Sequence, residues 1–267
     1  MTLLARLIRS YNRRRSEFFG KYLSRIGKLR ISHANGSWGH DLFDDLEKLE
    51  SPQSFQTIFD VGANRGEVTR VFLRRFPNAV IHAFEPVERT FAALNESLGR
   101  EPRATLHQMA AADVNGTAAM RTFAYSGLNT MVHVLQDSLR AKQIGEEKIV
   151  TCRLDQIIDK FGIKKVDLLK IDVEGFERNV LLGCSDYLKP EVIRYIFFEC
   201  HTITELASSG IGHTQLTEIN SILTARGYRF ITLYTEAIAI HEPIGSYNAL
   251  YGPLKLRLTR PGAPLIG

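Results

Sequence analysis

The sequence has few cysteines, no internal repeat and no long apolar run. Its three cysteines, Cys152, Cys184 and Cys200, include no C-x-x-C pair, so neither a zinc ribbon nor a disulfide framework is indicated. No stretch approaches the apolar length of a membrane-spanning helix, and the N-terminus lacks the apolar core and cleavage site of a secretory signal. We therefore expect a cytoplasmic protein that is soluble or lies peripherally at the inner face of a membrane.

Positive charge is concentrated near the N-terminus. The 267-residue chain has a formal net charge of +5, but residues 1–30 alone hold nine Lys and Arg side chains against one acid, Glu17. Apolar residues in this segment recur at steps of three and four, which predicts an amphipathic helix with an arginine-rich face. The helix could pack on the protein body or on the second subunit of a homodimer, lie on an anionic membrane or, least favoured, contact nucleic acid. We expect residues 1–50 to form a basic helical extension and residues 51–267 to form one domain.

From residue 55 onward, apolar strands alternate with helices. Strands are predicted at residues 55–62, 79–86, 104–113, 118–125, 166–175, 193–201, 228–234 and 248–253, with further apolar segments at 147–155 and 156–162. Helices are predicted at residues 67–76, 88–99, 177–188 and 214–227. This alternation predicts an α/β fold with a doubly wound, mostly parallel sheet that helices cover on both faces.

Acidic residues end two consecutive predicted strands. After Asp60, Gly62 and Gly66 allow a tight turn and a close approach of a ligand to the backbone. After the next strand, the carboxylate of Glu85 could accept hydrogen bonds from two ribose hydroxyls. Asn64 replaces the second glycine of a dinucleotide fingerprint, so the loop suits a nucleoside without phosphates better than NAD. The alternative is that Asp60 only caps the next helix and that Gly62 is an ordinary turn glycine.

Five motifs occur in a distinctive order. They are FDVGANRGEVT at 59–69, VIHAFEPVERTFAAL at 80–94, MAAADVNGTAAM at 109–120, LLKIDVEGFERNVLLG at 168–183 and IFFECH at 196–201. In order and spacing they resemble the FkbM family of S-adenosylmethionine-dependent methyltransferases, over roughly residues 55–202. The resemblance implies a Rossmann-like class I methyltransferase fold with a seven-stranded sheet and S-adenosylmethionine as cofactor. It also implies methylation of a hydroxyl on a sugar, glycolipid or related natural product.

The resemblance assigns residues to the cofactor site. The implied cofactor-binding residues are Asp60, Gly62, Ala63, Asn64, Gly66, Phe84, Glu85, Ala111, Ala112, Asp113 and Asp172. Within this set, Glu85 resembles the ribose ligand and Phe84 a residue of the nucleoside pocket. Residues 111–113 resemble the segment that contacts adenine, and Asp172 resembles the acid near the transferred methyl group.

Methylation of a hydroxyl requires a base, because a protonated hydroxyl is a poor nucleophile. His201 directly follows the FFEC strand end and is the first candidate, since histidine titrates near neutral pH. The predicted catalytic set is His201, Asp172 and Glu199, and His201 could alternatively be an ordinary edge histidine. The same three residues could hold a divalent cation, but histidine suits magnesium poorly, and we assign no metal ligand. Glu174 and Glu199 could instead orient the substrate or cap the helix at Gly175.

Other functions remain open. The chain could be a metal-assisted O-methyltransferase that acts on a non-sugar hydroxyl, or a non-catalytic Rossmann-like protein that binds membrane or nucleic acid through residues 1–30. A nicotinamide oxidoreductase is disfavoured, because G-x-G-x-x-G is absent and Asn64 takes the place of a glycine. Polar and aromatic residues that could contact an acceptor are Tyr125, Asn129, Thr130, His133, Tyr234, His241 and Tyr247.

Overall fold

The computed structural model describes residues 38–123, 126, 129–131, 143–201, 216–238 and 245–254, with residues 201, 235–238, 245 and 246 described by backbone alone. The basic helix predicted within residues 1–30 lies outside the described residues. A compact unit spans Gly39–Gly267, so it begins before the predicted boundary at residue 51. Helix α2 (Leu42–Leu49) belongs to this unit, because Tyr234 donates a hydrogen bond to Asp45 at 2.9 Å and Arg75 pairs with Asp44 at 2.8 Å.

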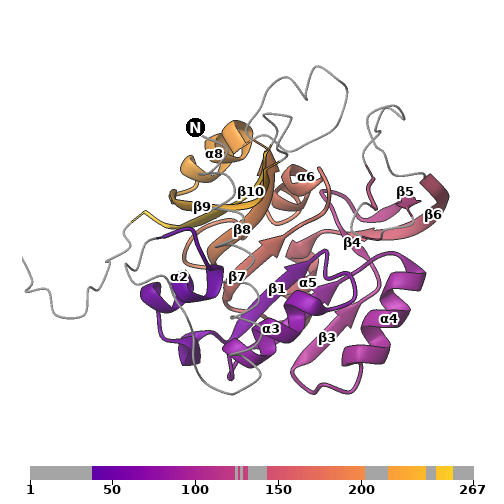
Figure 1. Cartoon of the computed structure of the whole chain (residues 1–267), viewed down its shortest axis with the longest axis horizontal. Coiled ribbons are helices and arrows are strands. Elements are labelled where there is room, and N and C mark those ends of the chain that lie inside the picture. Colours follow the sequence, from indigo (N-terminus) through magenta and orange to yellow (C-terminus); the bar gives the residue numbers. More distant parts are fainter. Residues whose placement is uncertain are drawn as a thin grey trace, which may run out of the picture. The chain divides into compact units, whose positions relative to one another are not determined.

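The main sheet has seven strands in the order β3-β2-β1-β7-β8-β10-β9 (Figure 1). Their bounds are β1 (Thr57–Val61), β2 (Val80–Phe84), β3 (Ala104–His107), β7 (Val166–Ile171), β8 (Ile193–His201), β9 (Tyr228–Ile238) and β10 (Gly245–Pro253). β10 pairs antiparallel with both its neighbours, and the other pairings are parallel. The mostly parallel, seven-stranded sheet confirms the predicted fold class. The strand order reverses between β1 and β7, and ligands of such sheets bind beyond the strand ends at this point.

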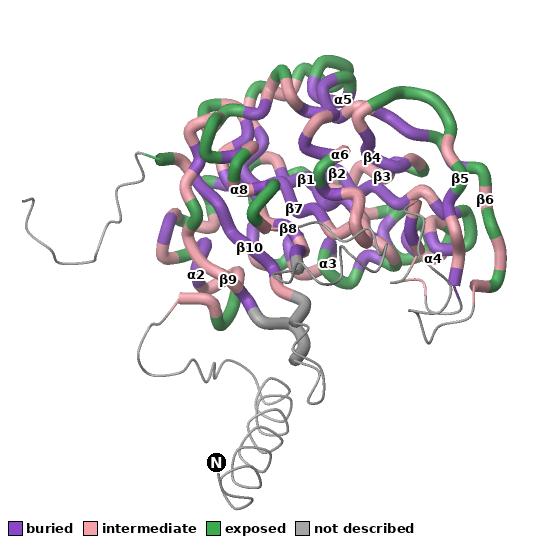
Figure 2. The backbone as a smooth tube through the Cα atoms, turned by 90° about the horizontal axis from the view of Figure 1, so that it is seen from above, coloured by how far each residue is buried: buried purple, intermediate pink, exposed green. Residues whose placement is uncertain are grey.

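Helices cover both faces of the main sheet. α2, α3 (Glu67–Arg75) and α4 (Glu88–Leu98) lie on one face, whereas α5 (Leu154–Phe161), α6 (Glu177–Leu182) and α8 (Leu216–Thr224) lie on the other (Figure 2). All six residues of β7 are buried, as expected for a parallel strand between two helical layers. The apolar faces of α5, α6 and α8 pack with β7 and β8 in one continuous cluster. α3 ends at Arg75, shortly before Pro77, because proline disfavours helical conformation in the residue before it.

A second sheet projects from the strand ends and was not predicted. It consists of β4 (Ala110–Ala111), β5 (Gly116–Phe123) and β6 (Gln143–Cys152) in the order β4-β6-β5 and is here called the accessory sheet. The strand predicted at 104–113 is therefore two strands: β3 pairs with β2 as far as His107, and β4 then pairs with β6. Val87, Ala110, Met120 and Ile149 form a small apolar core beneath the accessory sheet.

Candidate active site

The loop after β1 approaches its neighbours too closely for side chains. Gly62 has a φ of +77°, and a Cβ atom there would lie 1.8 Å from the carbonyl oxygen of Asp172. The N–H groups of Gly62 and Ala63 both donate to the Phe84 carbonyl, at 3.1 and 2.9 Å. The loop is thus held against the ends of β2 and β7, and only glycine fits at position 62. α3 begins directly afterwards at Glu67, behind Gly66 with a φ of +81°.

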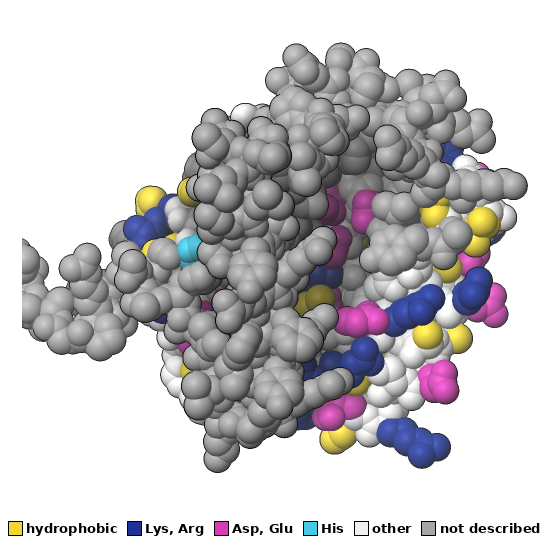
Figure 3. All heavy atoms as spheres, in the orientation of Figure 1, with side chains coloured by type: hydrophobic (Ala, Val, Ile, Leu, Met, Phe, Trp, Pro, Cys, Tyr) yellow, Lys and Arg dark blue, Asp and Glu magenta, His cyan; other side chains and the backbone are white. Residues whose placement is uncertain are grey.

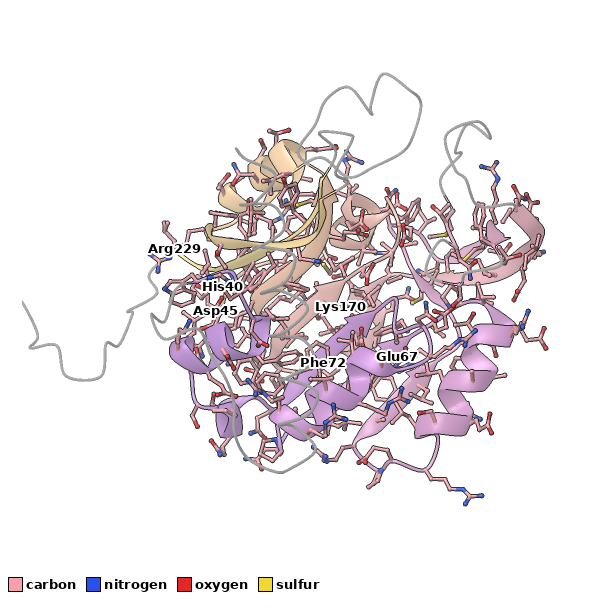
Figure 4. All side chains as sticks on the ribbon, viewed as in Figure 1. His40, Asp45, Glu67, Phe72, Lys170 and Arg229 are labelled. Carbon is pink, nitrogen blue, oxygen red and sulfur yellow. The ribbon has the colours of Figure 1, made fainter. Side chains whose placement is uncertain are left out.

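A buried lysine joins β1 to β7 below this loop. Lys170 is labelled in Figure 4. Its Nζ lies 3.1 Å from Asp60 Oδ1 and 3.4 Å from Asp172 Oδ2, and it donates to the Gly62 carbonyl at 2.8 Å. Burial alone would lower the pKa of Lys170, but the carboxylates of Asp60 and Asp172 outweigh burial, so the pKa is raised and the lysine stays charged. Asp60 is fully buried and also accepts a hydrogen bond from Thr69 Oγ1 at 2.6 Å. It therefore acts on the loop through Lys170.

Glu85 follows β2 and is only 7% exposed. Its Oε2 accepts from the Asn64 N–H at 3.1 Å, and its Oε1 accepts from the Val87 N–H at 3.0 Å. Burial raises the pKa of Glu85 to about 7, although these two backbone hydrogen bonds and Lys170 act in the opposite direction. Each carboxylate oxygen can accept a second hydrogen bond. Glu85 is therefore fixed in place with capacity left for ligand hydroxyls.

The turn after β7 has an unusual backbone. Glu174 has a φ of 54°, in the left-handed region that few non-glycine residues adopt. Glu177, at the start of α6, is 1% exposed and accepts from the N–H groups of Val173 and Gly175 at 3.1 and 3.3 Å. The buried carboxylate of Glu177 therefore anchors the turn from below.

Three acids converge at the ends of β7 and β8. Asp172, Glu174 and Glu199 each offer a carboxylate oxygen, and these oxygens lie within 4.8 Å of one another. The metal alternative considered from the sequence combined Asp172 and Glu199 with His201; the structure adds Glu174 to this group. His201 ends β8 opposite Ser246, and its side chain lies outside the described residues. Three carboxylates suit a hard divalent cation, and each of them could also accept a proton.

These elements surround a cavity of about 860 Å³, within the usual size range of ligand pockets. Acidic side chains, magenta in Figure 3, gather inside a hollow on this face of the molecule. The wall comprises residues 61–65, Glu67, Val68, residues 84–86 and 109–111, Met120, Ser126, Asn129, Met131, Lys170, residues 172–174 and Glu199. Apolar, hydroxyl-binding and acidic surfaces thus share one space at the switch point of the sheet.

Most of the predicted site residues line this cavity. They are Gly62, Ala63, Asn64, Phe84, Glu85, Ala111, Asp172 and Glu199. Asp60, Gly66, Ala112 and Asp113 are not part of the wall. The Ala112 N–H donates to the Cys152 carbonyl at 2.8 Å, and the Asp113 carbonyl accepts from Arg153 at 2.9 Å, because the chain turns here into the accessory sheet. Met109 and Ala110 occupy the wall where the resemblance implied Ala112 and Asp113.

The residues considered for acceptor contacts are dispersed. Asn129 lines the cavity, whereas Tyr234 and Tyr247 do not. The Tyr234 hydroxyl is bonded to Asp45 of α2. Tyr125, His133 and His241 lie outside the described residues. Thr130 is buried beside the cavity and contacts the turn after β7, where it donates to the Glu174 carbonyl at 2.8 Å.

Lys170 and the methionines of the wall were not predicted from the sequence. Lys170 could have been found, because a lysine inside the apolar strand VDLLKI must be buried and a buried ammonium requires carboxylate partners. Apart from Met1, the methionines of the chain are Met109, Met120 and Met131, and all three line the cavity. The three methionines come together because of the accessory sheet, which was not predicted. No local sequence pattern therefore indicates that they line one cavity.

The sheet order and the site define the fold of class I S-adenosylmethionine-dependent methyltransferases. Residues 60–230, more than half of the chain, match the methyltransferase FkbM domain. The chain therefore belongs to the FkbM methyltransferase family, which confirms the resemblance seen in its motifs.

Several characterised proteins are similar in sequence. The 2-O-methyltransferase NoeI of Sinorhizobium fredii is 30% identical over 161 residues, which cover 57% of this chain and 65% of NoeI. The 31-O-demethyl-FK506 methyltransferase FkbM of Streptomyces tacrolimicus is 32% identical over 171 residues, which cover 55% of this chain and 65% of that protein. The hexuronic acid methyltransferase AglP of Haloferax volcanii is 24% identical over 179 residues, which cover 64% of this chain and 70% of AglP. The chain thus spans just under two thirds of NoeI and FkbM.

Solved structures are more distant. The N-methyltransferase NodS of Bradyrhizobium japonicum is 10% identical with a TM-score of 0.44, over 78% of this chain and 91% of NodS. The same protein in complex with S-adenosylhomocysteine also matches with a TM-score of 0.44. Similarity at this level says nothing about the substrate.

Proposed function

We propose that this chain binds S-adenosylmethionine and methylates a hydroxyl of a sugar, glycolipid or related natural product. One observation carries the proposal: a single cavity joins the Glu85 carboxylate, the glycine loop after β1 and the Asp172–Glu174–Glu199 acids. The names of NoeI, a 2-O-methyltransferase, and AglP, a hexuronic acid methyltransferase, support this acceptor class.

The residues of the cavity fit the cofactor. Glu85 would accept hydrogen bonds from ribose hydroxyls, and Gly62 lets the loop that lines the cavity pack closely against the end of β7. Phe84, Met109 and Ala111 give the wall an apolar surface that suits adenine. The acidic wall favours a cationic ligand, because opposite charges attract more strongly in a partly buried site. When bound, S-adenosylmethionine supplies an electrophilic methyl group on a sulfonium.

The protein's own part in the reaction is to orient the acceptor and remove its proton. His201, at the end of β8, or a carboxylate of Asp172, Glu174 or Glu199 would take the hydroxyl proton as the oxygen attacks. A positioned base of this kind contributes about 10²–10⁴-fold to a rate. Replacing the base should therefore lower turnover while ligand affinity stays almost unchanged.

Ligand-dependent stability tests the cofactor. A ligand that binds only the folded state raises the melting temperature, so S-adenosylhomocysteine should raise it and NAD should not. A shift with NAD alone would overturn the proposal and favour an oxidoreductase. Methyl transfer is then followed by mass spectrometry of sugars and glycolipids incubated with the protein and S-adenosylmethionine. Among His201→Ala, Glu174→Gln and Glu199→Gln, the variant that loses turnover and retains affinity for S-adenosylhomocysteine identifies the base.

The acidic cluster favours a second candidate, a metal-assisted O-methyltransferase that acts on a non-sugar hydroxyl. Asp172, Glu174 and Glu199 would hold a divalent cation, which would lower the pKa of a bound hydroxyl. Titration of the protein with Mn²⁺, followed by electron paramagnetic resonance, measures such binding directly. Binding that is lost in Glu174→Gln would support this candidate, as would activity that EDTA removes and added Mg²⁺ restores.

A further inference from the structure

Four residues that follow β5 reach from the accessory sheet to the cavity. They are Ser126, Asn129, Thr130 and Met131, here called the strap residues. Ser126, Asn129 and Met131 line the cavity, and Thr130 is only 3% exposed. The backbone of Thr130 exchanges two hydrogen bonds with Arg121 of β5, at 3.0 and 3.2 Å. The Asn129 side chain accepts from the Phe123 N–H at 2.9 Å, so β5 holds the strap residues at both points.

Two hydroxyls of the strap residues bind loops of the main sheet. Ser126 Oγ donates to Asn64 Oδ1 at 2.9 Å, in the loop after β1. Thr130 Oγ1 donates to the Glu174 carbonyl at 2.8 Å, in the turn after β7. The strap residues therefore connect two loops that belong to neighbouring strands of the main sheet.

The two loop residues that the strap residues bind share an uncommon backbone conformation. Asn64 (φ 51°) and Glu174 (φ 54°) are the only non-glycine residues with positive φ in the described part of the chain. This conformation costs an L-residue of order 1 kcal/mol and persists where surrounding contacts hold it. The hydroxyls of Ser126 and Thr130 thus act at the two positions where the loops need external support.

Asn64 and Glu174, the two residues that the strap hydroxyls bind, belong to different parts of the site. The Asn64 N–H donates to Glu85 Oε2, so a displaced Asn64 would release one of the two bonds that fix the Glu85 carboxylate. The Glu174 carboxylate lies in the cluster with Asp172 and Glu199, so a displaced turn would separate the three acids. Neither Ser126 nor Thr130 belongs to the acidic cluster or bonds to Glu85.

We propose that Ser126 and Thr130 are positioning residues with separate tasks. Ser126 holds Asn64 and, through it, Glu85, and Thr130 holds the Glu174 turn and, through it, the acidic wall. The role assigned to each loop rests on the proposed methyl transfer. The positioning of the loops does not, because it follows from contacts in the ligand-free protein.

Amide hydrogen exchange of the ligand-free protein tests the positioning. Ser126→Ala should speed exchange of the Asn64 amide about three- to tenfold, the change expected when one hydrogen bond is lost, and should leave the Val173 and Gly175 amides unchanged. Thr130→Val should show the opposite pattern, and Thr130→Ser should restore wild-type rates because it retains the hydroxyl. Equal acceleration at both loops by either variant, or none at all, would overturn the proposal.

Calorimetry with S-adenosylhomocysteine tests the assigned roles. Ser126→Ala should weaken binding about three- to tenfold, whereas Thr130→Val, the matched control on the same segment, should change it less than about twofold. In an Asn64→Gly background, which lacks the acceptor of the Ser126 bond, Ser126→Ala should have no further effect. Equal losses in both single variants would contradict separate roles. Failure of the wild-type protein to bind S-adenosylhomocysteine would contradict the proposed function, and hydrogen exchange would still decide the positioning.

Discussion

At Glu85, the requirements of ligand binding and of stability oppose each other. Its pKa rises from 4.5 in a model compound to about 7 in the fold, chiefly because of burial. Since the folded pKa exceeds the unfolded one, the folded protein binds an extra proton between these values. The stabilisation that results is present at low pH and is lost as the pH rises through about 7. At alkaline pH, the shift corresponds to a cost of about 3 kcal/mol for burying the carboxylate.

Glu85→Gln should therefore raise the stability of the ligand-free protein at about pH 8 and weaken ligand binding at the same pH. We expect affinity for S-adenosylhomocysteine to fall by about 1.5–3 kcal/mol, since hydrogen bonds to a charged acceptor are lost. Wild-type affinity should rise between about pH 6 and pH 8, because ligand hydroxyls favour the ionised carboxylate, whereas the variant should show little pH dependence. Calorimetry across this range makes the measurement, and normal binding by the variant would remove Glu85 from the ligand site.

Lys170→Met should destabilise the fold strongly. Without the ammonium, Asp60 remains fully buried and its Oδ1 loses the contact with Lys170. Oδ2 still accepts a hydrogen bond from the Thr69 hydroxyl. Breaking such a buried pair costs about 3–5 kcal/mol in the free energy of unfolding, measured by urea denaturation. The double variant Asp60→Asn/Lys170→Met is the control and should recover much of the loss, because neither buried charge remains. A loss below about 1 kcal/mol would show that the pair is no more stabilising than a surface ion pair.

At the scale of single residues, the acids at strand ends were predictable, but their partners were not. Asp60, Glu85, Asp172 and Glu199 each follow an apolar run, and parallel strands bring their ends to one edge. Which of them faces the ligand depends on packing: Asp60 turns to Lys170 and Thr69, and Glu85 faces the cavity. This difference arises from strand register and burial, which involve contacts distant in sequence.

Helix α2 is fixed to the protein body by polar contacts as well as by its buried apolar face. Asp45, at 1% exposure, accepts from the Tyr234 hydroxyl at 2.9 Å and from the Gly39 N–H at 2.7 Å. Arg75 of α3 bridges Asp44 and Glu47 at 2.8 and 2.9 Å. Hydrogen bonds and ion pairs thus attach α2, which precedes the predicted boundary at residue 51, to α3 and β9, which follow it.

Tyr234→Phe should loosen α2 in particular. Removing the hydroxyl leaves one bond of a buried carboxylate unmade, which costs about 1–2 kcal/mol. Amide exchange in residues 42–49 should increase accordingly. Tyr251→Phe is a matched control, because the Tyr251 hydroxyl bonds to Asn220 at 2.9 Å and has no bond to α2. Similar acceleration of α2 in both variants would mean that the Asp45 bond does not anchor the helix.

Most elements of the main sheet followed from sequence patterns, but the accessory sheet did not. Apolar strands and amphipathic helices have periodicities that a short window contains. In contrast, the segment 104–113 reads as one strand, and only tertiary pairing separates β3 from β4 after His107. Residues of β6 alternate between half-buried and exposed from Gln143 to Lys148, so its N-terminal half lacks the apolar pattern of a strand.

The pH dependence of the whole fold involves a buried histidine pair. His82 Nδ1 and His107 Nε2 lie 3.0 Å apart, and the His107 ring stacks on Phe84 with centroids 4.4 Å apart. Burial lowers the pKa of each histidine to about 4, and for His107 the neighbouring His82 and Lys160 act in the same direction. Both rings are therefore neutral in the folded protein near pH 5, whereas they would be protonated in the unfolded chain.

The two buried histidines make the folded protein less stable as the pH falls. Because the folded pKa lies below the unfolded one, stability is complete above about pH 6.5 and is lost as the pH falls towards 4. The loss reaches about 2 kcal/mol per histidine at pH 5. Glu85 offsets part of it, since its raised pKa favours the folded state over the same range. Urea denaturation in the Glu85→Gln background should therefore show the full decline, and His82→Phe/His107→Phe in that background should abolish it. A stability that stays constant from about pH 7 to pH 5 would contradict the assignment.

The basic segment at residues 1–30 gives a further prediction for the whole chain. No helix among the described residues is both long and apolar enough to cross a bilayer. Membrane contact, one of the roles considered for residues 1–30, would use the nine Lys and Arg side chains of that segment, each worth about 1 kcal/mol near an anionic surface. Deleting residues 1–30 should release the protein from anionic vesicles and leave affinity for S-adenosylhomocysteine unchanged. If the chain with residues 1–30 intact does not bind anionic vesicles at low salt, membrane contact is excluded. A lower oligomer mass after the deletion would indicate a subunit interface.

The short pairing of β4 with β6 inside the accessory sheet has a consequence for ligand kinetics. β4 meets β6 through only two residue pairs, Ala110 with Thr151 and Ala111 with Cys152. Ala110 and Ala111 also line the cavity, as does Met120 of β5. Opening of this pairing would therefore loosen the part of the cavity wall that Ala110 and Ala111 form. The residence time of a ligand in the cavity would then depend on how often this pairing opens.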